Sequence, residues 1–237
     1  MEIRLRKLHE PSASLLLFTF LLADLAFVTI HLFHNLTPYF ANSMFNIELD
    51  NGYAERYQYL KYLGIIFVIG SLCIKRKTLL FLPWALLFTY FLADDAWQMH
   101  ERLGGWIAEG IAFRPPFRLR KLDLGELVVT MTAGLILLPS FLAAYYFGPR
   151  PVRLIFHNLF LLLTLLLAFA VVTDMVHAAF IGSPRIELYL GVIEDGGELI
   201  AVSLFAWYAF LLTKHLSIRE AYLLPLFLFL PRIAINK

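Results

Sequence analysis

A series of long apolar stretches constrains the fold of this chain more than any other feature of its sequence. The stretches cover residues 13–34, 58–74, 79–98, 125–147, 154–177 and 197–216. A helix needs about 20 mostly apolar residues to cross the hydrocarbon core of a bilayer. The chain of 237 residues is 60% hydrophobic and only 16% charged, a composition that ordinary soluble domains do not have. We therefore predict an all-α fold, a polytopic transmembrane helix bundle of about six spans.

The two ends of the chain need separate interpretation. Basic residues precede the first stretch, as in a secretory signal, but the stretch runs on to about Leu32 and is longer than a signal core. We therefore expect it to be retained as the first span. The segment 221–237 is apolar but broken by Pro225 and Pro231, so it is predicted to lie at the membrane interface. Residues 1–220 are predicted to form one transmembrane domain.

The basic side chains near the span ends predict the orientation, because they resist translocation across the membrane. With six spans both termini lie on one side, and most of the 20 Lys and Arg residues map to it: Arg4, Arg6, Lys7, Lys75, Arg76, Lys77, Arg150, Arg153, Lys214, Arg219, Arg232 and Lys237. The others map to the opposite side: Arg56, Lys61, Arg102, Arg114, Arg118, Arg120, Lys121 and Arg185. We predict cytoplasmic termini in a multi-pass protein of the cell membrane.

The acidic residues are distributed far more unevenly than the basic ones. Of the 18 Asp and Glu residues, most fall at outer span ends or in outer loops: Glu48, Asp50, Glu55, Asp94, Asp95, Glu101, Glu109, Asp123, Glu126, Asp174, Glu187, Glu194, Asp195 and Glu198. Four histidines map to the same ends: His31, His34, His100 and His177. Ionisable groups beside apolar membrane segments are costly unless they are paired, hydrated or metal-bound, so this gathering predicts a functional site.

Helical spacing places several of these side chains on shared faces. In the third stretch Asp94, Gln98 and Glu101 are predicted to form a stripe along one helix face. Asp174 and His177 lie three residues apart at the end of the fifth stretch, a spacing suited to joint metal coordination.

The sixth stretch continues this pattern. Glu194 and Glu198 are four residues apart, and Gly196 with Gly197 allows a neighbouring backbone or a ligand to approach closely.

These positions lead to a specific hypothesis for a divalent metal site. The predicted ligands are Asp94, Glu101, Asp174, His177, Glu194 and Glu198, with His100 or Asp95 as the catalytic acid or base. Secondary candidates are Glu55, Gln58, Glu126, His31 and His34. Carboxylates with a few imidazoles suit calcium, manganese, iron or zinc. Neighbouring arginines (Arg102, Arg118, Arg120 and Arg185) or bound protons are alternative ways to offset the charge.

Simpler explanations exist for individual members of this set. Glu126 and Glu194 are placed where helix caps occur, and acids in loops such as Asp50 are commonly just solvated. Histidines at a membrane interface extend their polar tips toward water. The lone Cys73 excludes an intramolecular disulfide and a cysteine-rich metal site, and a net charge of +2 gives no reason to expect a nucleic-acid partner.

Several motifs of the chain together resemble those of one family. DNGYAERYQY, DDAWQMHE, GE at Gly125 and Glu126, DMVH and EDGGE resemble an uncharacterised family of bacterial multi-pass membrane proteins, over residues 14 to 213. The resemblance implies a bacterial inner-membrane location and a shared site, and no substrate. A more distant likeness joins the chain to the ceramidase-like membrane hydrolases, whose paired histidines on the last helix it lacks.

Three functions remain open on the sequence alone. The first is a metal-dependent enzyme acting on a membrane lipid or a small amphipathic substrate at the outer leaflet. The second is a cation or proton pathway, although few polar residues continue toward the inner side. The third is an accessory subunit, with a homo-oligomer or a larger membrane complex as its partner.

Overall fold

The computed structural model describes residues 10–214, apart from residues 118 and 181, and this part of the chain is helical. The long helices are α2 (Pro11–Leu36), α3 (Tyr53–Arg76), α4 (Leu82–Trp97), α6 (Lys121–Phe147), α7 (Arg150–Leu167) and α9 (Pro184–Lys214). Shorter elements connect or extend them: η1 (Pro38–Phe40), η2 (Ser43–Phe45), α5 (Met99–Gly110), the π-helical turn η3 (Ala168–Thr173) and α8 (Asp174–Ala179). The predicted all-α transmembrane bundle is confirmed.

Five helical segments are long and apolar enough to cross a membrane. They are α2, α3, α6, the continuous run Arg150–Ala179 formed by α7, η3 and α8, and α9. The remaining predicted span, 79–98, is the 16-residue helix α4. At 1.5 Å per residue α4 is about 24 Å long, shorter than the ~30 Å hydrocarbon core, and it packs against α3 inside the bundle.

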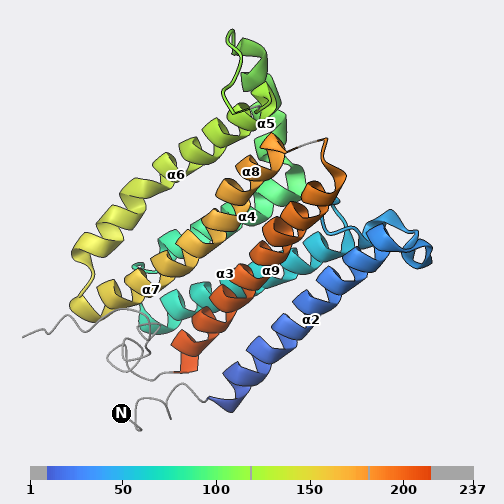
Figure 1. Ribbon diagram of the computed structural model, residues 1–237. Coiled ribbons are helices and arrows are strands. Elements are labelled where there is room, and N and C mark those ends of the chain that lie inside the picture. The colour runs from blue at the N-terminus through green and yellow to red at the C-terminus, as the bar shows by residue number, and fades with distance from the viewer. Residues whose placement is uncertain (1–9, 118, 181, 215–237) are drawn as a thin grey trace, which may run out of the picture.

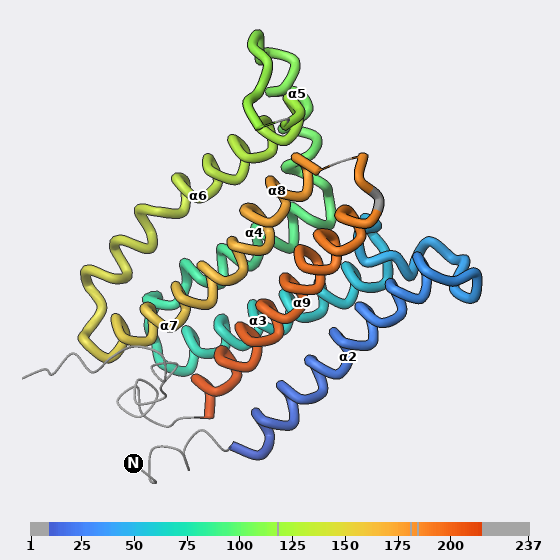
Figure 2. Tube along the Cα trace, viewed as in Figure 1, coloured from blue at the N-terminus to red at the C-terminus, as the bar shows by residue number. Residues whose placement is uncertain are grey.

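The six long segments alternate in direction, so that the connections fall into two groups (Figures 1 and 2). The segment with η1 and η2, α5 with its following loop, and the α8–α9 connection lie at one end of the bundle, here called the loop end. The first and last described residues lie at the opposite end. The predicted interfacial segment 221–237 and the basic residues of positions 1–9 fall outside the described residues.

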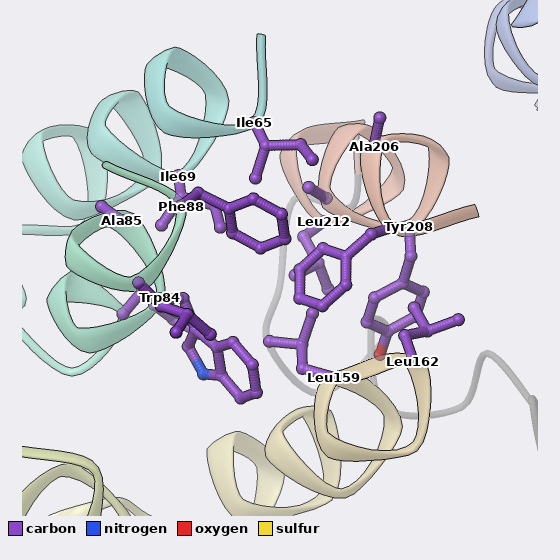
Figure 3. Packing of buried hydrophobic residues seen from close by; sticks show 14 of the residues in the cluster. Ile65, Ile69, Trp84, Ala85, Phe88, Leu159, Leu162, Ala206, Tyr208 and Leu212 are labelled. Atoms are coloured by element: carbon purple, nitrogen blue, oxygen red, sulfur yellow. The ribbon is translucent and has the colours of Figure 1, made fainter. Parts of the chain in front are cut away.

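The bundle is held together away from the loop end by an aromatic core. Trp84 of α4 is fully buried and contacts Phe141, Phe156, Phe160 and Phe205, with ring centroids 4.8–5.7 Å apart. Figure 3 shows α3, α4, α7 and α9 contributing side chains to this cluster. Dispersion between closely packed rings stabilises it.

The last helix begins earlier than the apolar pattern predicted. Its start was placed at 197, whereas α9 begins at Pro184, more than three turns before. Gly196 and Gly197 therefore lie inside a helix, where the ring of Phe169 packs directly on Gly197 and Val28 approaches Gly196. The close approach predicted at the two glycines is therefore made by side chains of neighbouring segments. Because α9 begins ten residues before Glu194, Glu194 is not a helix cap.

Candidate functional site

A cavity of about 650 Å³ occupies the loop end of the bundle. We call it the acidic chamber, because its charged lining contains eleven carboxylates, two histidines and one arginine: Glu48, Asp50, Glu55, Asp94, Asp95, His100, Glu101, Arg120, Glu126, Asp174, His177, Glu194, Asp195 and Glu198. The predicted ligands and acid–base residues all line this one cavity, together with the secondary candidates Glu55, Gln58 and Glu126.

One wall of the chamber is formed by α8 and α9. His177 Nδ1 lies 2.7 Å from Glu194 Oε2, which places the end of α8 directly against α9. Asp174 also lines the chamber, one helical turn before His177. Three of the predicted metal ligands are therefore neighbours.

A second wall joins α3 to α9 through a buried amide. Gln58 Nε2 donates to Tyr62 Oη at 2.9 Å and to Glu198 Oε2 at 3.3 Å. The amide fixes the orientation of the Glu198 carboxylate at the floor of the chamber, where Leu199 begins the apolar interior.

The prediction that Asp94, Gln98 and Glu101 share one helix face was wrong, because the boundary between α4 and α5 lies among them. Gln98 has φ 50° and ends α4, so the three side chains do not share one helix face. Asp94 Oδ1 accepts the backbone N–H of His100 at 2.9 Å, which stabilises the new helix start. Gln98 instead donates to Asp50 Oδ2 at 2.8 Å.

The same boundary between α4 and α5 places His100 beside Asp94 and so changes the pKa of its ring. Its Nδ1 lies 3.2 Å from Asp94 Oδ2. Burial lowers the pKa of His100, but the contact and charge of Asp94, aided by Asp95 and Glu126, outweigh burial and raise this pKa to about 9. His100 is therefore an imidazolium at neutral pH, able to donate a proton. Burial also raises the pKa of Glu101 nearby, and Asp50 adds to that shift.

The two remaining candidates, His31 and His34, do not line the chamber. His31 is fully buried and accepts the backbone N–H of Ile47 at 3.2 Å, while His34 contacts the carbonyl of Phe40. Both rings hold the connection between α2 and α3 in place. His31 reaches the chamber only indirectly, because its Nε2 lies 3.9 Å from Glu48 Oε1.

Glu48 was not among the predicted site residues, although it lines the chamber. Its carboxylate packs on Gly191 of α9, where a side chain would leave it no room. Burial raises the pKa of Glu48, partly offset by His177. Asp195 was also missed, because its neighbours in the EDGGE motif were chosen for their spacing.

Of the arginines expected to offset the acidic charge, Arg120 lines the chamber. Its Nη2 lies 2.6 Å from Asp123 Oδ1, and its backbone N–H is capped by Asp123 as well. Asp123, rather than Glu126, thus caps α6. Arg102 and Arg185 do not line the chamber, and Arg118 lies outside the described residues.

A buried ion pair lies beside the chamber and was not predicted. Lys61 Nζ donates to Asp24 Oδ1 at 3.0 Å, to Leu199 O at 2.8 Å and to Ser203 Oγ at 3.2 Å. Lys61 and Asp24 are only 2% and 1% exposed, so Lys61 is not the outer flanking charge that the sequence count assumed. The sequence did contain a signal for this pair: Asp24 and Lys61 are opposite charges inside two apolar stretches, and such groups pair with one another in a membrane.

Side chains of the metal-binding types surround the chamber without converging on one point. Within residues 10–214 as described, no three His, Cys, Asp or Glu side chains are close enough to hold one metal ion between them. Hard cations such as calcium complete their coordination with water and backbone oxygens, so an acidic cavity can hold one with fewer direct ligands.

Comparison with known sequences places the chain in a family. Residues 15–213 match the model of a family described as a domain of unknown function, DUF8692. No curated protein and no solved structure matches the chain. The matched range contains every charged residue that lines the acidic chamber. Since it covers most of the sequence, the chain belongs to the DUF8692 family.

Proposed function

We propose that this protein is a metal-dependent membrane enzyme whose acidic chamber binds a divalent cation and acts on a lipid or another amphipathic substrate. The observation that carries the proposal is the charge of the chamber. Eleven carboxylates and one arginine line a single cavity of about 650 Å³. Carboxylates at this density repel one another unless protons or cations offset them.

The cation is assigned to the wall formed by α8 and α9. Asp174, His177 and Glu194 lie there, and the contact between His177 and Glu194 already brings an imidazole and a carboxylate together. Oxygen-rich surroundings favour calcium or manganese over metals that prefer sulfur. A bound divalent cation would polarise an ester or amide carbonyl and lower the pKa of a water molecule.

His100 is assigned the role of general acid. It lies in the lining contributed by α5, and its pKa of about 9 keeps the ring protonated at neutral pH. An acid in this state can donate a proton to a leaving group. Asp95 of α4, which also lines the chamber, is the candidate base.

The position of the chamber favours an enzyme over a cation pathway. On α9 the lining of the chamber ends at Glu198 and Leu199. Beyond them lies the Lys61–Asp24–Ser203 cluster, whose groups bond to one another, and then the aromatic core around Trp84. A permeating ion needs polar groups along its whole route.

The test is cation binding by purified protein in nanodiscs. We expect calcium or manganese to bind, and Asp174→Asn and Glu194→Gln each to weaken binding at least about tenfold, as loss of one charged ligand implies. Glu109→Gln is the matched control, because Glu109 is an exposed carboxylate of α5 outside the chamber. Binding that is absent, or that responds equally to all three substitutions, would refute the proposal.

A further inference from the structure

The middle of α6 stands away from the rest of the bundle. The buried residues of this helix lie at its two ends, Asp123 and Gly125 at one and Phe141 and Ala144 at the other. A Cβ added to Gly134, between them, would meet no atom within 4 Å. The helix is therefore clamped at both ends and unpacked between them, at the depth of the hydrocarbon core.

The acidic chamber extends into this unpacked region. On three helices an acidic residue of its lining is followed, one turn deeper in the membrane, by an uncharged one. The pairs are Asp94 and Tyr90 on α4, Glu126 and Thr130 on α6, and Asp174 of α8 with Ala170 of η3. The cavity is therefore charged at the loop end and uncharged where it meets the flank of α6, where Leu127, Leu166 and Leu167 add apolar surface.

A ligand that fills this cavity must match both its charged part at the loop end and its uncharged part beside α6. Apart from two histidines, Arg120 is the one basic side chain of the described lining, and it already pairs with Asp123, so little fixed positive charge remains to compensate the eleven carboxylates. A positively charged headgroup supplies such compensation, whereas an anionic one adds to the repulsion. The uncharged part, beside the largely exposed middle of α6, suits a hydrocarbon chain, which gains free energy by leaving water or by staying in a lipid-like environment.

We propose that the substrate is an amphiphile with a cationic amine headgroup and a single hydrocarbon chain, which enters from the membrane between α6 and η3. The amine lies among the carboxylates of the chamber, and the chain lies along Thr130, Leu127 and Ala170. This inference rests on the proposed function in that it takes the acidic chamber to be the active site.

The test measures binding of radiolabelled dodecylamine to the protein in phosphatidylcholine nanodiscs, after subtraction of empty nanodiscs. We expect saturable binding, at least about tenfold tighter than that of butylamine or dodecanoate, because butylamine lacks the chain and dodecanoate lacks the charge.

Two substitutions in the π-helical turn test the position of the chain. Ala170→Trp fills the uncharged part of the cavity and should weaken dodecylamine binding at least about tenfold. Val172→Trp is the matched control, because Val172 is 62% exposed on the same turn and does not line the cavity; it should leave affinity unchanged. Thr130→Phe repeats the test from the α6 wall if Ala170→Trp does not fold.

Calcium or manganese binding measured on the same samples separates the two proposals. Retained cation binding together with loss of dodecylamine binding in Ala170→Trp supports the chain position. Unchanged dodecylamine affinity in Ala170→Trp and Thr130→Phe, or equally tight dodecanoate binding, overturns the inference alone. Absence of cation binding, with the amine results as expected, overturns the proposed metal dependence and leaves the amine site standing.

Discussion

At the scale of single residues, the buried charge pair determines how α2 joins the bundle. Few residues of α2 are buried, and these are Ala13, Asp24 and His31. Asp24 receives hydrogen bonds from Lys61 at 3.0 Å and from Ser203 at 2.6 Å, and these bonds tie α2 to α3 and α9. A buried pair is costly to break, because removal of one partner leaves the other charged group without compensation.

We predict that Lys61→Met lowers the free energy of unfolding by about 3–5 kcal/mol, since it leaves Asp24 buried and unpaired. The Lys61→Met, Asp24→Leu double substitution should recover much of this loss, because it removes both charges. Unfolding by dodecyl sulfate in mixed micelles provides the measurement. Arg56→Met is the control, because Arg56 is an exposed cation on the same helix. An effect no larger than that of the control would contradict the assigned role of the pair.

At the scale of helices, a glycine contact sets the position of α5 over the chamber. A Cβ on Gly125 of α6 would overlap the carbonyl oxygen of Gly104, and one on Gly104 would overlap the backbone of Glu126. The two helices therefore cross backbone against backbone. This crossing positions His100 and Glu101 of α5 beside Glu126, and all three line the chamber.

Gly125→Ala should separate the two helices and cost about 1–3 kcal/mol, as overpacking does in well-packed interiors. Amide hydrogen exchange should be faster throughout α5 as a result. Gly134→Ala, on the same helix and facing open space, should instead be neutral or stabilising by about 0.5–1 kcal/mol. Equal exchange rates of α5 in the two variants would show that the crossing does not hold α5 in place.

At the scale of the whole molecule, charged and apolar side chains occupy different depths of the bundle. The acidic chamber occupies the loop end, and the aromatic core fills the other half. The family assignment adds no function to this arrangement, and the bacterial origin and the likeness to ceramidase-like hydrolases stay predictions. The basic-residue count predicts that the loop end faces away from the cytoplasm.

We predict that a membrane-impermeant thiol reagent, added to intact cells, labels Asn42→Cys and Glu109→Cys but labels Arg150→Cys only after permeabilisation. Asn42, between η1 and η2, and Glu109 of α5 are exposed on elements that lie at the loop end, whereas Arg150 is exposed at the start of α7, at the opposite end. Each variant is made in a Cys73→Ala background, because Cys73 is the natural cysteine. Labelling of Arg150→Cys in intact cells, without labelling of the other two, would reverse the orientation.

The sequence alone determined the helical bundle and much of the chamber. Apolar length and composition predict spans, since a membrane segment must satisfy its own backbone hydrogen bonds. The alternating spans then bring their loop-end side chains together, which is how Asp94, Asp174 and Glu194 were placed in one site from pattern alone.

Only the tertiary structure decided which of these side chains meet. The break at Gln98 depends on the capping of α5 by Asp94, and local spacing within one helical pattern does not reveal it. The pairing of Lys61 with Asp24, and of His177 with Glu194, joins residues far apart in the chain. Such contacts depend on how whole helices rotate and cross, and these rotations are fixed by close packing at points such as Gly125 and Gly197.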